Sequence, residues 1–244
     1  MEDIVIRNGQ TEIHLSSTGG TITSAMVGKL EILYPWRQIG DKARGGCHIC
    51  APWFGQSPRS KKKHGYLRDL EARDVKLESN NAKLIFHHPG NESYPWSLGY
   101  EIGVYAYTNG LKMTLRIDRM DDKEVIPAPV LPAFHPYFGC KDESTVRVLN
   151  GGAAYNGFSC ESRSVGISSE AILIAMPSKN IMMELGGAFA PVKSQLVLWT
   201  DAPKDYVCVE PVLQNKRTFE TPGGPFLCVD SFLDLSMNLT VAEY

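Results

Sequence analysis

The chain has 244 residues, of which 43% are hydrophobic and 21% charged, and its formal net charge is −2. These values are ordinary for a soluble globular protein with a core. They give no electrostatic reason to expect binding to nucleic acid or to an anionic membrane. No apolar run approaches the roughly 20 residues that cross a bilayer, and the acidic start Met1-Glu2-Asp3 is unlike a signal peptide. We therefore expect a cytoplasmic protein.

Strand signals follow one another along the chain, and helical periodicity is nearly absent. Each signal is a short alternating or β-branched run bounded by glycine, proline or another turn residue. The expected strands and hairpins are Ile4–Ile6, Glu12–Leu15, Thr21–Met26, Leu30–Leu33, Asp74–His87, Tyr100–Asp118, Val146–Leu149, Leu196–Trp199, Tyr206–Val209, Phe226–Val229 and Met237–Val241. Short helices are expected only at Leu67–Arg73 and Ser231–Asp234.

Two of these segments give the sharpest predictions. Asn109-Gly110 separates two alternating runs within Tyr100–Asp118, which is a strong signal for a β-hairpin. Four prolines crowd Ile126–Pro136, so this segment should not form a fully paired central strand. Many short strands over this length predict one large antiparallel β-sandwich domain covering residues 1–244, with a barrel as the alternative.

The six cysteines are expected to be free thiols, because no signal peptide directs the chain to an oxidising compartment. Cys47-His48-Ile49-Cys50 has the spacing of metal ligands. A structural zinc site needs a second ligand pair, which the sequence lacks, so a buried strand is the simpler interpretation. We expect neither a metal nor another cofactor.

His135 is the first candidate for acid–base chemistry. The following Pro136 restricts it to extended geometry, so it should lie on a strand or at a strand end. An imidazole fixed in this way can take or give a proton near neutral pH. Packing against Phe134, Tyr137 and Phe138 as a core histidine is the plainer alternative.

Glu210 is the second candidate. It ends an apolar strand and is followed by Pro211. Desolvation there would raise the pKa of the carboxyl toward the range of a general base. A surface glutamate just past the strand is the alternative.

A third group of candidates lies nearer the start of the chain. Arg44 precedes two glycines that permit close approach of the backbone to a ligand or another strand. His64 and Arg68 are four residues apart, a spacing that places them on one face of either a strand or a helix. An ion pair of Arg68 with a neighbouring carboxylate is an equally good interpretation.

Taken together, these motifs resemble the aldose 1-epimerase (galactose mutarotase-like) superfamily, and within it the hexose-6-phosphate mutarotases. The ordered set that carries the resemblance is Arg44-Gly45-Gly46, Pro52-Trp53-Phe54-Gly55, His64-Gly65-Tyr66-Leu67-Arg68, Phe134-His135-Pro136-Tyr137-Phe138 and Cys208-Val209-Glu210-Pro211. The resemblance implies a twisted antiparallel β-supersandwich with its site in a cleft.

The resemblance also implies roles. Glu210 would be the general base and His135 the general acid in opening and reclosing a sugar ring without a cofactor. His64 would orient the sugar, and Arg44 and Arg68 would bind it, in the phosphate branch through the phosphate. The expected partner is a small sugar or sugar phosphate, bound by a monomer. The acidic substrate contact that the family often has is not matched by an Asp in Ser168–Leu173, so either Glu170 takes its place or the contact is missing.

Three alternatives stay open on the sequence. The substrate could be a free aldose, or the chain could bind carbohydrate without catalysis. The basic run Lys61-Lys62-Lys63 fits either a solvated loop or a phosphate-binding mouth.

Overall fold

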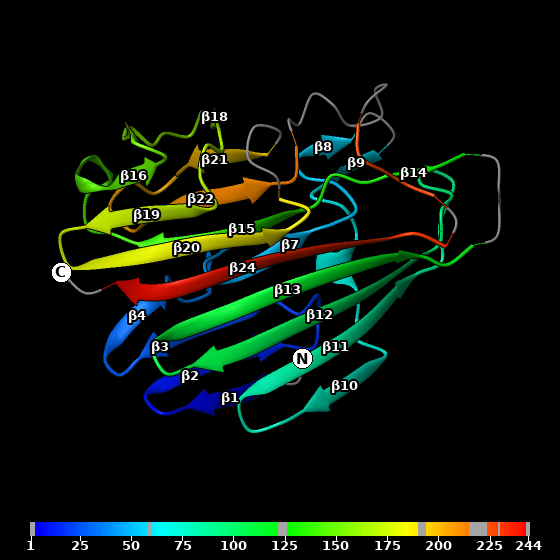
Figure 1. The fold of residues 1–244 in the computed structure, drawn as a ribbon, viewed down its shortest axis with the longest axis horizontal. Helices are drawn as coiled ribbons and strands as arrows, with labels where there is room; N and C mark the ends of the chain where they lie inside the picture. The colour runs from blue at the N-terminus through cyan, green and yellow to red at the C-terminus, as the bar shows by residue number, and fades with distance from the viewer. Residues whose placement is uncertain are drawn as a thin grey trace.

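A computed structural model describes residues 3–57, 60–121, 126–189, 194–214, 224–228 and 230–242. Within these residues the chain forms two nine-stranded sheets, and every strand pair within them is antiparallel. This confirms the predicted all-β class and the open, two-sheet arrangement rather than a barrel (Figure 1). None of the helices in the described part of the chain has the length and apolar character needed to span a membrane.

The first sheet contains the central strands that position the site. Its strands, in spatial order, are β1 (Asp3–Asn8), β2 (Thr11–Ser16), β3 (Ile22–Val27), β7 (Cys47–Cys50), β15 (Ala133–Gly139), β22 (Tyr206–Val212), β21 (Gln195–Trp199) and β18 (Arg163–Gly166), and β4 (Leu30–Leu33) also pairs with β3. The order shows that strands far apart in sequence, β7, β15 and β22, lie side by side at its middle.

The second sheet covers one face of the first (Figure 1). Its strands, in spatial order, are β10 (Asp74–Leu77), β11 (Asn81–His88), β12 (Leu98–Tyr107), β13 (Gly110–Arg119), β24 (Phe232–Ala242), β20 (Lys179–Gly187), β19 (Ala171–Met176), β16 (Arg147–Asn150) and β17 (Ala153–Tyr155). The C-terminal strand β24, red in Figure 1, lies between β13 and β20.

Short elements complete the described structure. The two-stranded pairs are β5 (Arg37–Ile39) with β6 (Lys42–Arg44), β8 (Gln56–Ser57) with β9 (Ser60–Lys63), and β14 (Ala128–Pro129) with β23 (Phe226–Leu227). The 3-10 turns are η1 (Leu67–Asp69) and η2 (Glu143–Thr145).

The hairpin around Asn109-Gly110 is confirmed, because β12 and β13 pair from Leu98–Arg119 to Tyr107–Gly110. The helix expected at Leu67–Arg73 shrinks to the single turn η1. The helix expected at Ser231–Asp234 is wrong: this segment enters β24, whose pairing with strands on both sides outweighs a weak local preference. Val229, at the end of one expected strand, lies outside the described residues.

As predicted, the segment Ile126–Pro136 does not form a fully paired central strand. Its last residues, from Ala133 to Pro136, begin β15, which is a central strand of the first sheet. Register pairs tie them to β7 on one side, from Ala133–Cys50 to Pro136–Cys47. The earlier part does avoid central pairing, because β14 forms only a two-residue ladder with β23.

Alternation along β15 and β22 separates the core from the site. Phe134, Phe138, Val207 and Val209 belong to the core cluster, which draws buried side chains from both sheets. The alternate residues, such as His135, Tyr137, Tyr206 and Cys208, point to the opposite face, where a second buried cluster contains Tyr34, Tyr137, Tyr206 and Cys208. The face of the first sheet turned away from the core is therefore lined by polar and aromatic side chains.

Candidate active site

His135 and Glu210 lie opposite each other on the two central strands. The register pairs Ala133 with Val212 and Tyr137 with Cys208, which places His135 directly across from Glu210 and on the same face. Nε2 of His135 is 3.4 Å from Oε1 of Glu210. The two residues are only 5% and 2% exposed, so an acid and a base of the predicted types share one largely dry position.

The ladder between these strands is interrupted at this position. No register pair joins β15 to β22 between the Ala133–Val212 and Tyr137–Cys208 pairs, although each strand keeps its register with its other neighbour there. Pro136 and Pro211 occupy this stretch, and neither has an N–H to donate. The prolines after His135 and Glu210 thus explain the gap.

Two further histidines surround His135. The ring of His48 stacks on it with centroids 4.5 Å apart, and that of His64 meets it edge-on at 5.5 Å. Tyr137 stacks on His135 at 4.9 Å. Nδ1 of His135 and Nε2 of His48 are buried and lack a hydrogen-bond partner among the described residues. The site is therefore a cluster of three imidazoles beside one carboxylate.

His48 is one of the site residues that sequence reasoning missed. The prediction of a buried strand at Cys47–Cys50 is confirmed by β7, where His135 pairs with His48. Its neighbour Cys47 contacts Met113 of the second sheet. Cys47, His48 and Cys50 do not gather into a group of metal-ligand atoms in the described structure. The alternating face of β7 was the signal that could have placed His48 beside His135.

A strained turn positions His64. The residue has a φ of 64°, and Gly65 has a φ of 71°. A Cβ on Gly65 would lie 2.0 Å from the carbonyl oxygen of Ala51, so only glycine permits this approach. Nδ1 of His64 is 3.2 Å from Sγ of Cys50 and accepts the N–H of Gly55 at 3.3 Å. These contacts hold the ring against His135.

All three imidazoles are neutral around pH 7. Burial lowers the pKa of His64 to about 4, with the charges of Arg68 and Lys63 adding to the effect. Burial, and then the charge of His64, lowers the pKa of His48 well below its usual value. Burial, followed by the charges of His48 and His64, does the same to His135. Protonation of His64 thus opposes protonation of His48, and protonation of either one opposes protonation of His135.

Arg44 lies at the edge of this cluster and is already paired. Its Nη2 and Nε donate to the two oxygens of Asp201 at 2.6 and 3.2 Å, and its guanidinium lies 5.4 Å from the ring centre of Trp199. Tyr206 also donates to Asp201. Burial opposes ionisation of Asp201, but the hydrogen bonds from Arg44 and Tyr206 hold its pKa below the usual value. Sequence reasoning missed Asp201.

The glycines after Arg44 serve the backbone rather than a ligand. A Cβ on Gly46 would lie 1.9 Å from the carbonyl oxygen of Ile22, and one on Gly45 would lie 2.3 Å from that of Pro35. The carbonyl of Gly46 accepts the N–H of Tyr137 at 3.0 Å. Of the two alternatives left open by the sequence, close approach to a neighbouring strand is the one observed.

Arg68 lies on the other side of the cluster and is less fully paired. Its Nε is buried and has no hydrogen-bond partner among the described residues, with Oδ1 of Asp69 4.0 Å away. Asp69 pairs instead with Lys62, at 2.6 Å. The predicted ion pair of Arg68 with a neighbouring carboxylate is therefore weak, and its charge acts on His48 and His64.

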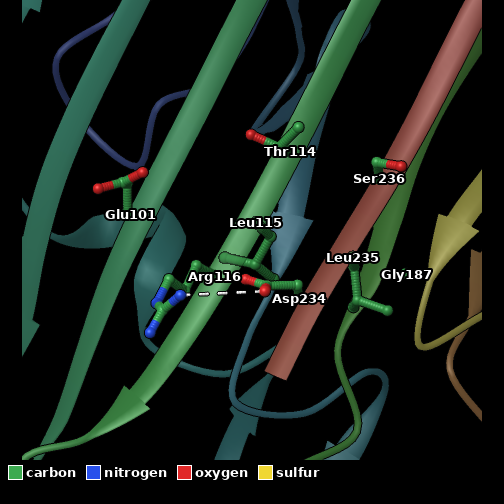
Figure 2. Close-up of a pocket in the computed structure, with 8 residues that line it drawn as sticks. All are labelled: Glu101, Thr114, Leu115, Arg116, Gly187, Asp234, Leu235 and Ser236. Atoms are coloured by element: carbon green, nitrogen blue, oxygen red, sulfur yellow. Dashed lines mark ion pairs between the residues drawn. The ribbon is translucent and has the colours of Figure 1, made fainter. Parts of the chain in front are cut away.

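Two shallow depressions show where a ligand could approach. One is lined by Lys42, Arg44, Asp201 and Tyr206, beside the cluster. The other lies on the outer side of the second sheet, over β13 and β24, where Arg116 faces Asp234 at 3.9 Å (Figure 2). The second depression lacks a histidine or a buried acid–base pair among its lining residues. The histidine cluster is therefore the better candidate site.

Solved structures with the same architecture include one described as a galactose mutarotase-like protein, from Lactobacillus casei ATCC 334. A candidate aldose 1-epimerase from Escherichia coli K12 superposes with a TM-score of 0.80 at 15% identity, covering 100% of this chain and 99% of that one. A galactose 1-epimerase from Lactobacillus acidophilus NCFM gives 0.71 at 12% identity, with 99% and 94% covered. A protein from Synechocystis sp. PCC 6803 gives 0.74 at 20% identity, with 100% and 96% covered. These similarities define the fold.

The sequence itself specifies the family. The family model of aldose 1-epimerase matches residues 2–157, which is more than half of the chain. The chain belongs to the aldose 1-epimerase family. The matched part includes Arg44, His48, His64, Arg68 and His135, whereas Glu210 lies beyond it. No curated protein is similar enough in sequence to count as a match.

Proposed function

We propose that the protein is a cofactor-free mutarotase that interconverts the α and β anomers of an aldohexose 6-phosphate. The observation that carries the proposal is the buried pair of His135 and Glu210, 3.4 Å apart on one face of the central strands. The two oxygens that exchange protons in anomerisation, O1 and O5, are both bonded to C1. An adjacent acid and base can therefore serve both oxygens at once.

In the proposed reaction Glu210 removes the proton of the O1 hydroxyl while His135 protonates O5, and the C1–O5 bond breaks. Rotation about C1–C2 turns the other face of the aldehyde toward O5. Reclosure with the proton transfers reversed gives the other anomer and restores both groups. The pair must hold one proton at the start of the cycle and holds one at its end.

The surroundings of His135 make its protonated form a strong acid. Burial and the adjacent imidazoles lower the pKa of His135, so an imidazolium formed there releases its proton readily to a weakly basic ring oxygen. The carboxylate of Glu210 offers the compensating charge at 3.4 Å. The cost is that only a small fraction of His135 is protonated at pH 7 in the free protein.

The phosphate assignment is supported by the unequal pairing of the two arginines. Arg44 is neutralised by Asp201, whereas the Nε of Arg68 has no hydrogen-bond partner among the described residues beyond the long 4.0 Å contact to Asp69, and its side chain is 34% exposed. Lys63 lies close enough to affect His64 as well. We therefore propose that Arg68, with Lys63, binds the phosphate, and that Arg44 and His64 bind sugar hydroxyls. The neutralised Arg44 equally suits a free aldose, which is the second candidate.

The test is exchange NMR or polarimetry on freshly dissolved α-glucose 6-phosphate, α-glucose and α-galactose. Acceleration of the phosphorylated sugar above the others supports the full proposal. Acceleration of free sugars alone, unaffected by Arg68→Met, replaces the phosphate assignment with the free-aldose one. If the protein binds sugar but accelerates no anomerisation, the mutarotase hypothesis is rejected and the carbohydrate-binding hypothesis is retained.

A further inference from the structure

The central strands bring together three side chains of the types that bind zinc. Ligand atoms of His135, Cys208 and Glu210 all lie within 4.8 Å of one another, and all three residues are buried. Cys208 and Glu210 are two residues apart on β22 and so share a face, and His135 lies opposite Glu210 on β15. The anomerisation proposed above uses His135 and Glu210 but has no use for the thiol.

The spacing is close to what a tetrahedral metal needs. Zinc bonds of roughly 2.0–2.3 Å to nitrogen, oxygen and sulfur place neighbouring ligand atoms about 3.3–3.8 Å apart. The 3.4 Å between His135 Nε2 and Glu210 Oε1 already falls in this range. The remaining separations are at most 4.8 Å and so require movements of up to about 1.5 Å. Three protein ligands would leave one coordination position for water or a sugar hydroxyl.

We propose that His135, Cys208 and Glu210 form an inhibitory binding site for Zn²⁺. The metal takes the place of the thiol proton of Cys208, which is released to solvent, and coordinates the imidazole and carboxylate on which proton transfer depends. The bound ion removes the acid and the base together. Catalysis and metal binding are therefore mutually exclusive at this position.

The charge balance of the site explains why a divalent cation is suited to it. Burial, and then the nearby carboxylate of Glu210, raises the pKa of the Cys208 thiol well above its usual value. A thiolate and a carboxylate side by side in a buried site require positive charge, and the bound metal supplies it. The neutral imidazole of His135 is already in the form that a metal ligates.

The binding test does not depend on sugar chemistry. Because Cys160 and Cys228 are exposed, both are first replaced by serine to remove surface thiols. Equilibrium dialysis with Zn²⁺ should then give one ion per chain, and Co²⁺ should give a thiolate-to-metal charge-transfer absorption. Cys208→Ala should weaken binding at least 100-fold and abolish that absorption. Cys47→Ala is the matched control, since Cys47 is equally buried but packs toward Met113. This variant should leave the affinity for Zn²⁺ and the Co²⁺ absorption unchanged.

The inhibition experiment rests on the proposed function. The binding experiment does not, so it distinguishes failure of the metal site from failure of the proposed function. Zn²⁺ should inhibit anomerisation by the protein and by Cys47→Ala, and leave Cys208→Ala active. Stoichiometric binding in a protein without mutarotase activity would reject the function and keep the site. Weak binding, or binding that Cys208→Ala does not reduce, would overturn the site whatever the activity. Thermal denaturation of each variant checks that it is folded.

Discussion

The ring of His48 lies nearly face to face with that of His135, with centroids 4.5 Å and ring planes 25° apart. The two residues are a register pair of β7 and β15, so the sheet itself sets their stacking. After burial, the charge of His48 is the largest contribution that lowers the pKa of His135. His48 is therefore a positioning residue that also sets how readily His135 holds a proton.

His48→Phe keeps a ring against His135 but removes the second imidazole. The pKa of His135 should rise, because a protonated His48 no longer opposes its protonation at acid pH, and the pH-dependent part of the kcat/KM profile should move to higher pH. For the unaltered protein, kcat/KM should increase as the pH falls below 7, as more His135 is protonated. A pH–rate profile of the two proteins measures both effects. If the pH dependence of kcat/KM is unchanged and the rate is lower by the same factor at every pH, His48 contributes only packing against His135.

Removal of either member of the central pair should abolish most of the activity. Glu210→Gln and His135→Asn should each lower kcat about 100- to 10,000-fold, the range of general acid–base catalysis. The double variant should be little worse than either single one, since the two act as a unit. Exchange NMR gives the rates, and additive losses in the double variant would contradict a shared proton-transfer step.

Asp201→Asn should separate the two possible substrates. Loss of the carboxylate adds one net positive charge beside the site, which should lower KM for a sugar phosphate by long-range attraction although the phosphate itself binds at Arg68. KM for a free sugar should rise, because Arg44 loses the partner that orients it. The substitution also removes charge-assisted hydrogen bonds worth about 2 kcal/mol to folding. Tyr206→Phe, which removes only the hydroxyl donor to Asp201, is the control and should have a smaller effect on both. Equal changes in KM for both sugars would show that the charge of Arg44 does not contribute to binding of the substrate phosphate.

The histidine cluster should make the fold sensitive to acid. His64 has an unfolded pKa near 6.5 and a folded pKa of about 4, so the unfolded chain binds more protons between these values. The free energy of unfolding should therefore fall as the pH drops from 6.5 to 4, by up to about 3 kcal/mol for His64 alone. His48 and His135 act in the same direction.

Urea unfolding across this pH range tests the effect. His64→Gln should flatten the slope. His14 is the control of opposite sign, because its hydrogen bond to Glu12 raises its pKa and its contribution is lost as the pH rises. His14→Gln should therefore make the acid loss of stability steeper. A His64→Gln protein with an unchanged slope would contradict a buried neutral imidazole.

Gly46 and Gly40 provide a matched test of close backbone approach. Both have positive φ, 66° and 58°, but a Cβ on Gly46 would lie 1.9 Å from the carbonyl oxygen of Ile22, whereas one on Gly40 meets nothing within 4 Å. Gly40→Ala should cost about 1–2 kcal/mol of conformational strain. Gly46→Ala should cost several kcal/mol more and disturb Arg44. Similar unfolding free energies for the two variants would show that the clash relaxes.

Local patterns predicted the all-β class, the hairpin of β12 and β13, and the strand that carries His135. They did not reveal β19 and β20, whose apolar residues are separated by a weak turn signal at Pro177-Ser178. The predicted candidates were individual residues, and only the sheet order shows which of them meet. The sequence did not indicate that Asp201 belongs to the site, because its partner Arg44 is 157 positions away along the chain. A lone aspartate in a loop carries no signal of such a distant contact.

The gap in the ladder around Pro136 and Pro211 has a mechanical consequence. His135 and Glu210 are fixed to their outer neighbours, β7 and β21, but not by register pairs to each other's strands. The ladder that joins their two strands is therefore weakest beside the acid and the base, because two of its N–H donors are missing there. For the anomerisation proposed above, the two prolines thus leave the fewest backbone constraints at the point where a sugar oxygen must enter between the two groups.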